Sequence, residues 1–537
     1  MASSSSASQN RERFIGTQAF KASVLVFDPD ARREERVDGA TSDEFAAYRI
    51  RDRHTPDFPY SDLTTLCGLF VIDAVHVEGQ RLDAKIDGRK RAGAPRKSKG
   101  FEALAHESAT SVFRSSRKVD RMLADKFVWR MIVDTSMEAW PDNPERWASP
   151  TPINRKRRDH LLNSALAMMD DVVEHKDTYR DFVIGVASGA GMADPATGTS
   201  TSPDVSHVIL GDATWGLSRF NRTEDERFDV DLSTGEILRE RRFDPDTGRK
   251  HYNAKKAGQA LVSLAIRNPH PHEWLVGDFE YLEPGRSNEG EVFLEMANDI
   301  TERLPGVRAV AYDMALSDAQ VNEIIRHGLH ALVKVPRIIG NRPAAAHIGN
   351  LPFAHPKGTS RRRNLVVDAV DGCPVITVNS DGEDWVVPLV RISTKFRRRA
   401  KGNAVAYGIW EIPDDQRVPE SWVGLRCRVR HDSDPSEPTL RTRALRTIPE
   451  NDPDWSRLFG TRNSIESMHA HLKEGMPGRR FRNVGQRRRT INHCGYMLSR
   501  AVSTLLAYHH RTGADLEKWF GQWKPPDPKW WLSEEAA

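Results

Sequence analysis

Two short apolar segments that each end in an aspartate place the strongest constraint on the fold of this chain. Residues 206–216 read SHVILGDATWG, with the apolar run ending at Asp212, and residues 306–317 read GVRAVAYDMALS, with Asp313 in the same place. A continuous apolar run followed by small residues is typical of a strand buried on both faces. We predict two core strands, each with a carboxylate at its carboxyl end. Taken alone, either aspartate has the commoner role of a turn former or helix cap.

A third carboxylate lies on an amphipathic segment, 459–473, which reads FGTRNSIESMHAHLK. On a helix, Arg462, Glu466 and Lys473 fall within about 40° of one another. Such a row can hold an anion through its two cations and a metal ion through its carboxylate. For an isolated helix the alternative is a solvated face with an Arg462–Glu466 ion pair. The apolar residues of another side, which we expect to be buried, are Ile465, Met468 and Leu472.

These residues together resemble a known family. The order Asp212, Asp313, Glu466, with Arg462 and Lys473 in the spacing Arg-x3-Glu-x6-Lys, resembles the DDE transposases of bacterial insertion sequences. The similarity is to the cut-and-paste group with a Tyr-x2-Arg-x3-Glu-x6-Lys signature, and it covers roughly residues 200–512. Three oxygen ligands also form the set that Mg²⁺ prefers.

The spacing of the carboxylates and one substitution refine this resemblance. The aspartates are 313 − 212 = 101 residues apart, and the glutamate follows after 466 − 313 = 153 residues. The second separation is too long for one loop and implies an inserted domain. Phe459 stands where the signature has tyrosine, so aromatic packing is retained and a hydroxyl that could contact DNA is lost.

The resemblance implies a function and a set of site residues. Asp212, Asp313 and Glu466 would be the catalytic residues and would hold two Mg²⁺ (or Mn²⁺) ions, with Asp212 shared between them. The reaction would be cleavage at the ends of an insertion sequence, followed by strand transfer of the freed 3′-hydroxyl into target DNA. The partners would be double-stranded DNA, as terminal inverted repeats and target, and a second copy of the chain in a DNA-bound homodimer. His469 and His471 are candidate acid/base groups that a two-metal mechanism does not need.

The order of the surrounding segments predicts an α/β fold with a ribonuclease H-like catalytic core. The expected strands are 259–267, 273–280, 307–313 and 329–335, the expected helices are 289–304 and 317–327, and 219–256 is an expected β-hairpin excursion. Short strand-like runs separated by Gly, Pro and Asp predict an inserted all-β domain over 336–450, and helical periodicity predicts a mainly helical DNA-binding region at the N-terminus. The predicted domains are 1–20 disordered, 21–195 DNA-end-binding helical region and linker, 196–335 first part of the core, 336–450 inserted β domain, 451–512 second part of the core, and 513–537 C-terminal tail.

Within the N-terminal region, residues 101–123 have the pattern of two helices joined by a tight turn. The second would carry basic side chains suited to the major groove of DNA. A helical bundle with a basic solvent face explains the same pattern. The basic residues in question are Arg114, Arg117, Lys118 and Arg121.

The distribution of charge favours a nucleic-acid partner more than the net charge of +4 does. Basic runs without acids occur at 89–99, 155–158, 361–363 and 479–489, and in an expected loop at 395–401. One such run is usually a solvated face, whereas five suggest contact with a polyanion. The candidate DNA-binding residues are Arg462, Lys473, Arg479, Arg480, Arg482, Lys395, Arg397 and Arg398.

The remaining features bound the cellular setting. Four widely spaced cysteines without a CxxC pair argue against a zinc knuckle or a disulfide scaffold and fit a reducing cytosol. The N-terminal segment lacks the apolar core of a signal peptide, and no apolar stretch has membrane-spanning length. We expect a bacterial cytoplasmic protein that associates with the nucleoid when bound to DNA.

Two alternative functions use the same residues. A ribonuclease H-like nuclease without strand transfer would share the three carboxylates but lack dedicated recognition of DNA ends. A non-catalytic, transposase-derived DNA-binding protein would keep the basic runs but would be expected to have lost a carboxylate. All three carboxylates are present in this sequence.

Overall fold

The computed structural model describes residues 60–526 apart from short internal segments. The segments outside the description are 88–97, 170–171, 221, 232, 251–252, 271, 284–287, 314, 337–344, 357–361, 381, 399–402, 434–439, 475 and 477–479. The predicted disordered segment 1–20, most of the basic run 89–99 and Arg479 therefore lie outside the described residues. The chain divides into two compact units, namely Met1–Phe182 with Pro271–Glu273 and Arg487–Ala537, and Val183–His270 with Trp274–Gln486.

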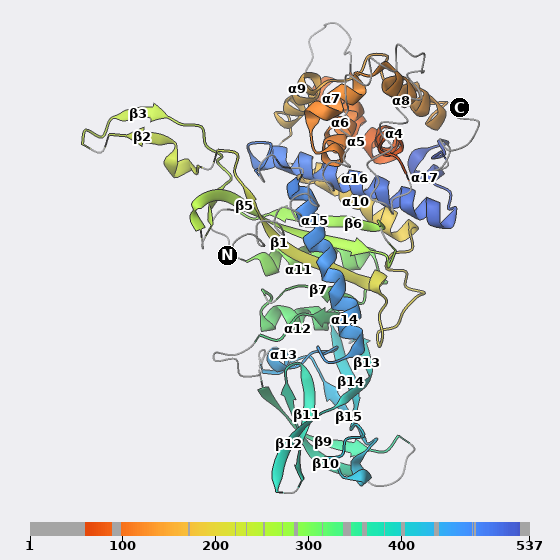
Figure 1. The fold of residues 1–537 in the computed structure, drawn as a ribbon, viewed down its shortest axis with the longest axis vertical. Coiled ribbons are helices and arrows are strands. Elements are labelled where there is room, and N and C mark those ends of the chain that lie inside the picture. The colour runs from red at the N-terminus through yellow and green to blue at the C-terminus, as the bar shows by residue number, and fades with distance from the viewer. Residues whose placement is uncertain are drawn as a thin grey trace, which may run out of the picture. The chain divides into compact units, whose positions relative to one another are not determined.

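The first unit is built from helices (Figure 1). Its helices are α4 (Asp62–Val71), α5 (Asp73–Asp87), α6 (Gly100–Phe113), α7 (Ser116–Leu123), α8 (Lys126–Ala139), α9 (Arg155–Leu166), α16 (Gln486–Thr512) and α17 (Glu517–Phe520), and α10 (Val173–Gly189) leads from this unit into the second. The two helices predicted within 101–123 are confirmed as α6 and α7. They are separated at Arg114, whose φ of 56° ends α6.

A buried ion cluster joins three helices of this unit. Glu107 of α6 accepts hydrogen bonds from Arg488 Nη2 at 3.1 Å and Asn492 Nδ2 at 2.8 Å, both on α16. Arg158 of α9 places its Nε 3.2 Å from the same carboxylate. Arg158 and Arg488 belong to two of the basic runs, 155–158 and 479–489, that we had interpreted as surfaces for a polyanion. Both guanidinium groups are instead buried in the protein core and paired there.

The second unit contains a six-stranded sheet that carries the two aspartates. Its strands are β1 (Val208–Leu217), β4 (Gly248–Lys250), β5 (Asn253–Arg267), β6 (Trp274–Tyr281), β7 (Ala309–Ala311) and β8 (His330–Leu332). β5 pairs antiparallel with β1 on one side and with β4 and β6 on the other. On its other side β1 pairs parallel with β7, and β7 with β8. The predicted strands and helices of this region are present, and the fold is mixed α/β. The expected strand ends differ, because β1 continues to Leu217, five residues beyond Asp212, and β7 ends at Ala311, two residues before Asp313.

Helices cover both faces of this sheet. α11 (Glu289–Arg303) packs against β5, β6 and β1, and α15 (Asn463–Glu474) packs against β1 and β5. Gly211 of β1 faces α11, because a Cβ there would meet Phe293 Cε2 at 2.1 Å. Since neighbouring residues of a strand point to opposite faces, Asp212 points toward α15. α12 (Asp318–Arg326) follows β7 and contacts α11.

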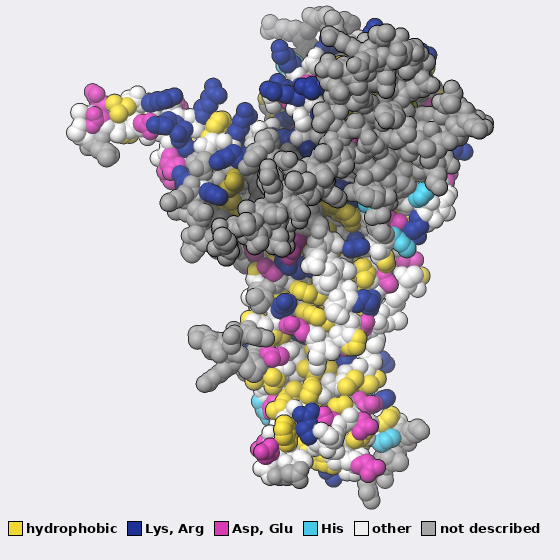
Figure 2. All heavy atoms as spheres, viewed as in Figure 1, with side chains coloured by type: hydrophobic (Ala, Val, Ile, Leu, Met, Phe, Trp, Pro, Cys, Tyr) yellow, Lys and Arg dark blue, Asp and Glu magenta, His cyan; other side chains and the backbone are white. Residues whose placement is uncertain are grey.

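A two-stranded ribbon of β2 (Phe228–Val230) and β3 (Ile237–Glu240) leaves the sheet between β1 and β5 (Figure 1). It is the predicted hairpin, with its turn at Gly235, whose φ is 74°. Arginine side chains lie on it among acidic and apolar ones (Figure 2). Cross-strand ion pairs such as Arg227–Glu240, at 2.8 Å, link the two strands.

A seven-stranded antiparallel sheet lies between the second aspartate and Glu466 in the sequence. Its strands, in spatial order, are β12 (Glu383–Pro388), β11 (Cys373–Ser380), β10 (Arg362–Val370), β9 (Ala345–Ala354), β15 (Arg426–Arg430), β14 (Ala404–Glu411) and β13 (Val390–Arg398). It encloses a separate apolar core that includes Phe353, Trp410 and Val429. β12 and β13 lie at opposite ends of this order although only Leu389 separates them in sequence, so the sheet curls back on itself.

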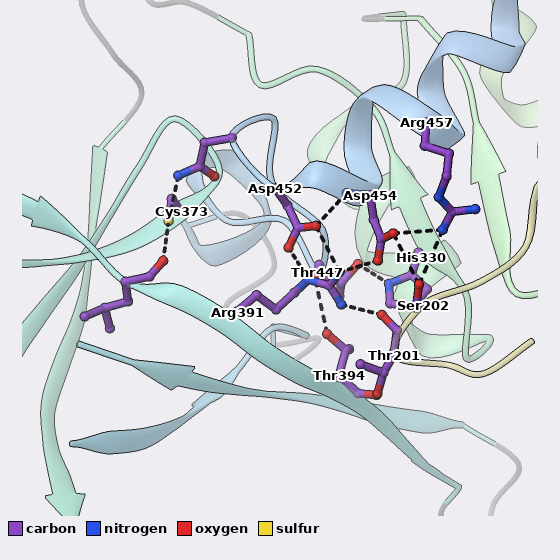
Figure 3. A network of polar contacts seen from close by, with 12 residues as sticks. Thr201, Ser202, His330, Cys373, Arg391, Thr394, Thr447, Asp452, Asp454 and Arg457 are labelled. Carbon is purple, nitrogen blue, oxygen red and sulfur yellow. Dashed lines mark hydrogen bonds and ion pairs between the residues drawn. The ribbon is translucent and has the colours of Figure 1, made fainter. Parts of the chain in front are cut away.

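A polar network holds this sheet to the segments that lead into β1 and α15 (Figure 3). Arg391 of β13 donates to Asp452 at 2.6 Å and to Asp454 at 2.9 Å, and also donates to the carbonyl of Thr201. The acids stand at the start of α14 (Pro453–Phe459). His330 of β8 is bonded to Thr447 Oγ1 at 2.9 Å, and burial lowers its pKa to about 4, so the ring is neutral at pH 7.

Three expectations about local structure differ from what is observed. Residues 395–398 continue strand β13, paired with β14, where we had expected a basic loop over 395–401. Residues 487–512 pack with the helical unit, whereas we had placed them in the second part of the core. The predicted tail contains α17, with Phe520 and Trp523 buried, because these rings pack into the helical unit. Every described helix is too short or too polar to cross a lipid bilayer.

The Glu107 cluster predicts a pH dependence of stability. Burial raises the pKa of Glu107, but the charges of Arg488 and Arg158 outweigh it and lower the pKa from 4.5 to about 2. A depressed carboxyl pKa stabilises the fold above the unfolded value, and this stability is lost as the pH falls from about 4.5 to about 2. We expect Glu107→Gln to lower the free energy of unfolding by about 3 kcal/mol at pH 7, measured by denaturant unfolding.

The difference between Glu107→Gln and the unaltered protein should shrink as the pH falls below about 4.5. Glu138→Gln, at an exposed position of α8, is the matched control and should change stability by less than about 0.5 kcal/mol at every pH. A Glu107→Gln effect that is constant from pH 7 to pH 3 would contradict the proposed ion cluster.

Candidate active site

The register of two parallel strands brings Asp212 and Asp313 together. β1 and β7 pair as Val208 with Ala309 and Leu210 with Ala311. Asp212 lies two residues further along β1, and Asp313 lies two residues beyond the last residue of β7, so both aspartates follow the paired positions at the same edge of the sheet. β7 ends at Ala311, so the edge of β1 beside Asp212 is not covered by that strand.

Arg462 links Asp212 to the third predicted carboxylate. Its Nη2 donates to Asp212 Oδ1 at 3.1 Å, and its Nη1 donates to Glu466 Oε1 at 2.6 Å. The side chain of Asp212 is 16% exposed and that of Glu466 is 54% exposed. The Arg462–Glu466 pair that we had considered as a plain surface ion pair is thus present, and the same guanidinium also reaches the sheet.

The segment that carries Arg462 is not one continuous helix. α14 ends at Phe459, a 3-10 turn covers Gly460–Arg462, and α15 begins at Asn463. The expected helix therefore starts after Arg462. The Arg462–Glu466 contact is still formed, because the 3-10 turn leads directly into α15. The apolar face is confirmed, since Ile465, Met468 and Leu472 are buried.

His469 is a second partner of Asp212. Its Nδ1 lies 3.4 Å from Asp212 Oδ2, and the ring is almost completely buried. Because an ionised carboxylate only accepts hydrogen bonds, this geometry favours the proton on Nδ1. Burial raises the pKa of Asp212, but the hydrogen bond and charge of His469 and the charge of Arg462 more than offset it, so the pKa lies below its ordinary value. Asp212 is consequently anionic at neutral pH.

Glu289 is an acidic residue of this site that the sequence analysis missed. It is half-buried at the first position of α11, after the N-cap Asn288. Burial raises its pKa, and the negative charges of Asp313 and Asp212 raise it further. Only the pairing of strands in space reveals its place, because 313 − 289 = 24 and 289 − 212 = 77 residues separate it from the aspartates.

The other predicted residues are distributed around the second unit. Lys473 lies in the last turn of α15 and is partly exposed. The backbone of Arg480 forms an isolated β-bridge with Leu217 at the end of β1, and its Nη1 donates to the Ser218 carbonyl at 2.8 Å. Phe459 stacks on Trp455 with ring centroids 4.8 Å apart. The remaining candidates are Lys395, Arg397 and Arg398, exposed on β13, and Arg482, whose carbonyl accepts from Arg219.

The donor chemistry of the site fits a hard divalent cation. Asp212, Asp313, Glu466 and Glu289 offer oxygen atoms only, which Mg²⁺ and Mn²⁺ prefer. The like-charge repulsion at Glu289 is the kind that a bound cation relieves. In the conformation described, no group of three or more His, Cys, Asp or Glu side chains among the described residues is close enough to hold one ion. The guanidinium of Arg462 lies between two of the carboxylates, and Asp313 Oδ1 accepts from the Ala315 amide at 2.8 Å.

Comparison with known proteins identifies no family for the chain. No protein-family model and no curated protein matches the sequence. A piggyBac transposase in a synaptic complex with hairpin DNA, determined by cryo-EM, is similar with a TM-score of 0.33 and 12% sequence identity, over 84% of this chain and 75% of that one. A TM-score of this size does not establish a shared fold, so the site has to be judged by its own residues.

The contact of Gly211 with α11 predicts a large effect of one methyl group. In Gly211→Ala the new Cβ would lie 2.1 Å from Phe293 Cε2 and 2.5 Å from Tyr312 Cδ2. We expect this overpacking to lower the free energy of unfolding by about 1–3 kcal/mol, measured by denaturant unfolding. Gly460→Ala is the control, since no atom lies within 4 Å of its Cβ position, and it should be neutral or slightly stabilising. Equal stability of the two variants would contradict the packing described.

Proposed function

We propose that this chain is a DNA transposase of the DDE type, with a ribonuclease H-like core, that cleaves DNA at the ends of an insertion sequence and transfers the freed 3′-hydroxyl into target DNA. The observation that carries the proposal is the register of β1 and β7, which sets Asp212 beside Asp313, together with Arg462, which ties Asp212 to Glu466. The strand order β6-β5-β1-β7-β8, with β5 antiparallel and the other strands parallel to one another, supports the proposed core.

In this proposal Asp212, Asp313 and Glu466 hold divalent ions. Such ions, when bound, activate a water molecule or a 3′-hydroxyl and stabilise the leaving oxygen of the phosphodiester. Asp212 is kept anionic by Arg462 and His469, so it is ready to serve as a ligand at neutral pH. Glu466 is more than half exposed and joined to the sheet through Arg462 alone among its described polar contacts, so it is free to reorient when a ligand arrives.

Arg462 has a second proposed role in holding the nucleic acid. A guanidinium offers five donors and binds phosphate in a forked geometry. Two nitrogens of Arg462 contact carboxylates. A divalent cation that neutralised those carboxylates would free the two nitrogens to bind a phosphate oxygen. Lys473, about two helical turns beyond Glu466 on α15, would contact the flanking DNA backbone as a point charge.

The basic residues outside the site support DNA as the partner. Lys395, Arg397 and Arg398 are exposed on β13, a strand at the end of the seven-stranded sheet. Non-specific affinity for DNA depends mainly on such contacts to phosphate. Two DNA ends have to be joined to one target, so we propose a homodimer in the DNA complex and a cytoplasmic, nucleoid-associated protein.

Substitution of the carboxylates tests the catalytic proposal. Purified protein is incubated with labelled DNA that contains the ends of the element, with Mg²⁺ or Mn²⁺, and nicked and joined products are resolved on gels. We expect Asp212→Asn, Asp313→Asn and Glu466→Gln each to lower the cleavage rate by at least about 100-fold. The control Glu291→Gln removes an exposed acid of α11 and should cleave normally.

The same assay separates the proposal from its alternatives. Cleavage without any joined product would indicate a nuclease that lacks strand transfer. DNA binding without cleavage in the unaltered protein would indicate a non-catalytic DNA-binding protein. Undiminished cleavage by all three carboxylate variants would remove the proposed site altogether. Inverted repeats on both sides of the coding region, with a short target duplication, are expected only of a mobile element.

A second measurement tests the role of the β13 cations. We expect the triple variant Lys395→Ala, Arg397→Ala, Arg398→Ala to bind DNA more weakly and to reduce the slope of log K against log salt by up to about 3. The matched control replaces three arginines that are already paired with acids of the same unit, and its slope should stay unchanged. An unchanged slope in the first variant would contradict phosphate contact by β13. The control positions are Arg417, Arg426 and Arg430.

A further inference from the structure

The two halves of the proposed site come from segments that lie far apart in the sequence. Asp212 lies on β1, which follows a short 3-10 turn at Val205–His207. Glu466 lies on α15, which follows α14 and the 3-10 turn at Gly460–Arg462. Because 466 − 212 = 254 residues separate the two acids, the covalent chain does not set their approach. Contacts between the folded segments have to set it.

One residue of the seven-stranded sheet, Arg391, is turned toward these segments by a β-bulge. In the pairing of β13 with β14, Arg391 lies opposite Trp410 and Ser393 lies opposite Ile409, so Ile392 is an extra residue. Side chains directly opposite one another leave the same face of a sheet, and Trp410 belongs to the buried core. Without the extra residue, Arg391 would leave the same face as Ser393. The bulge thus re-aims Arg391 to the buried face.

Arg391 donates from all three of its guanidinium nitrogens, and the acceptors belong to two different segments (Figure 3). Its Nε and Nη2 bind the two carboxylate oxygens of Asp452 at 2.6 Å and 3.1 Å. Nη2 also donates to Asp454 Oδ2 at 2.9 Å, and Nη1 donates to the carbonyl of Thr201. The side chains of Arg391 and Asp452 are only 5% and 9% exposed. A buried forked pair has a fixed geometry, so Arg391 sets the position of one segment relative to the other.

A second set of contacts joins the same two segments without Arg391. Arg457 of α14 donates to the carbonyl of Pro203 at 2.7 Å and to Asp454 Oδ1 at 2.8 Å. Ser202 Oγ donates to the same Asp454 oxygen at 3.2 Å. Since the side chain of Arg457 is 40% exposed, these contacts contribute less than the buried ones. Arg391 is therefore the buried centre of a joint between residues 201–203 and residues 452–457.

Each side of this joint leads to one carboxylate of the proposed site. Residues 201–203 precede the 3-10 turn that enters β1 and reaches Asp212. Residues 452–457 begin α14, which continues through Arg462 to Glu466. A shift at the joint would change the contact between Arg462 Nη2 and Asp212 Oδ1, which are 3.1 Å apart. A misplacement of about 1 Å at a reacting centre can lower a rate by about 100-fold.

We propose that Arg391 is a positioning residue of the catalytic site, which fixes the approach of the segment that carries Glu466 to the strand that carries Asp212. The inference rests on the proposed function, because it assigns a part in that reaction to Arg391. The described polar contacts of Arg391 include none of the three carboxylates, so it acts through the segments that it joins. The inserted β domain thereby takes part in assembling the site.

Single-turnover cleavage of labelled DNA that contains the ends of the element tests this role. Arg391→Lys keeps the positive charge but loses the fork that holds both segments. We expect the rate at saturating DNA to fall by about 10-fold or more, while the DNA concentration that gives half the maximal rate changes by less than about twofold. Arg426→Lys is the control, because Arg426 pairs with Glu411 of the same sheet at 2.6 Å, and it should cleave as the unaltered protein does.

Amide hydrogen exchange of the full-length protein without DNA provides a readout that does not depend on cleavage. In Arg391→Lys, exchange should become faster in residues 201–207 and 452–466 together and stay unchanged in β14. Arg426→Lys should change exchange in neither segment. A general loss of stability would speed exchange in β14 as well, so the expected pattern separates positioning from a merely structural role.

The outcomes distinguish this inference from the proposed function. If Arg391→Lys cleaves as fast as the unaltered protein while Asp212→Asn does not cleave, Arg391 has no positioning role and the proposed function stands. Exchange that rises equally in β14 and in the two segments would also overturn the positioning role. If the unaltered protein does not cleave, the proposed function fails, and the role of Arg391 in that reaction fails with it.

Discussion

The close approach of Phe293 and Tyr312 to the backbone of Gly211 is the contact from which the geometry of the site follows. Any side chain at position 211 would push these rings away, since they would lie 2.1 Å and 2.5 Å from its Cβ. With glycine there, α11 rests directly on β1 and the end of β7 lies against both. Three acidic residues are brought to one edge of the sheet as a result: Asp212 next to Gly211, Asp313 next to Tyr312, and Glu289 one helical turn before Phe293.

That concentration of negative charge has to be balanced, and the protein does so with groups from a distant part of the chain. Arg462 and His469 both come from the segment around α15, some 250 residues after Asp212, and both contact its carboxylate. The balance is uneven, because the pKa of Asp212 is lowered whereas that of Glu289 is raised. The charge of Asp212 is compensated by its contacts with Arg462 and His469, whereas Glu289 is affected mainly by burial and by the like charges of Asp313 and Asp212. Uncompensated negative charge on oxygen ligands is the chemistry that a divalent cation prefers.

The sequence predicts the local parts of this architecture well, because they depend on periodicity. The apolar runs before Asp212 and Asp313, the turn between α6 and α7, and the buried face of α15 were all expected. Features that depend on partners far away in the sequence were not expected. Arg158 and Arg488 look like surface charges until Glu107 is seen between them, and residues 395–398 look like a loop until β14 pairs with them. Glu289 could not be found from its own segment, since an acid in the first turn of a helix is common for electrostatic reasons. Domain boundaries and the metal ligands remain predictions.

The network around Arg391 connects the seven-stranded sheet to both segments that carry the acidic residues. Its guanidinium holds Thr201, a few residues before the strand that carries Asp212, and also Asp452 and Asp454, a few residues before the helix that carries Glu466. The side chain belongs to β13, whose far end bears the exposed cations. β13 is therefore connected through one side chain to both acidic segments. A displacement of this strand at Arg391 would act on the segment before Asp212 and on the segment before Glu466 together.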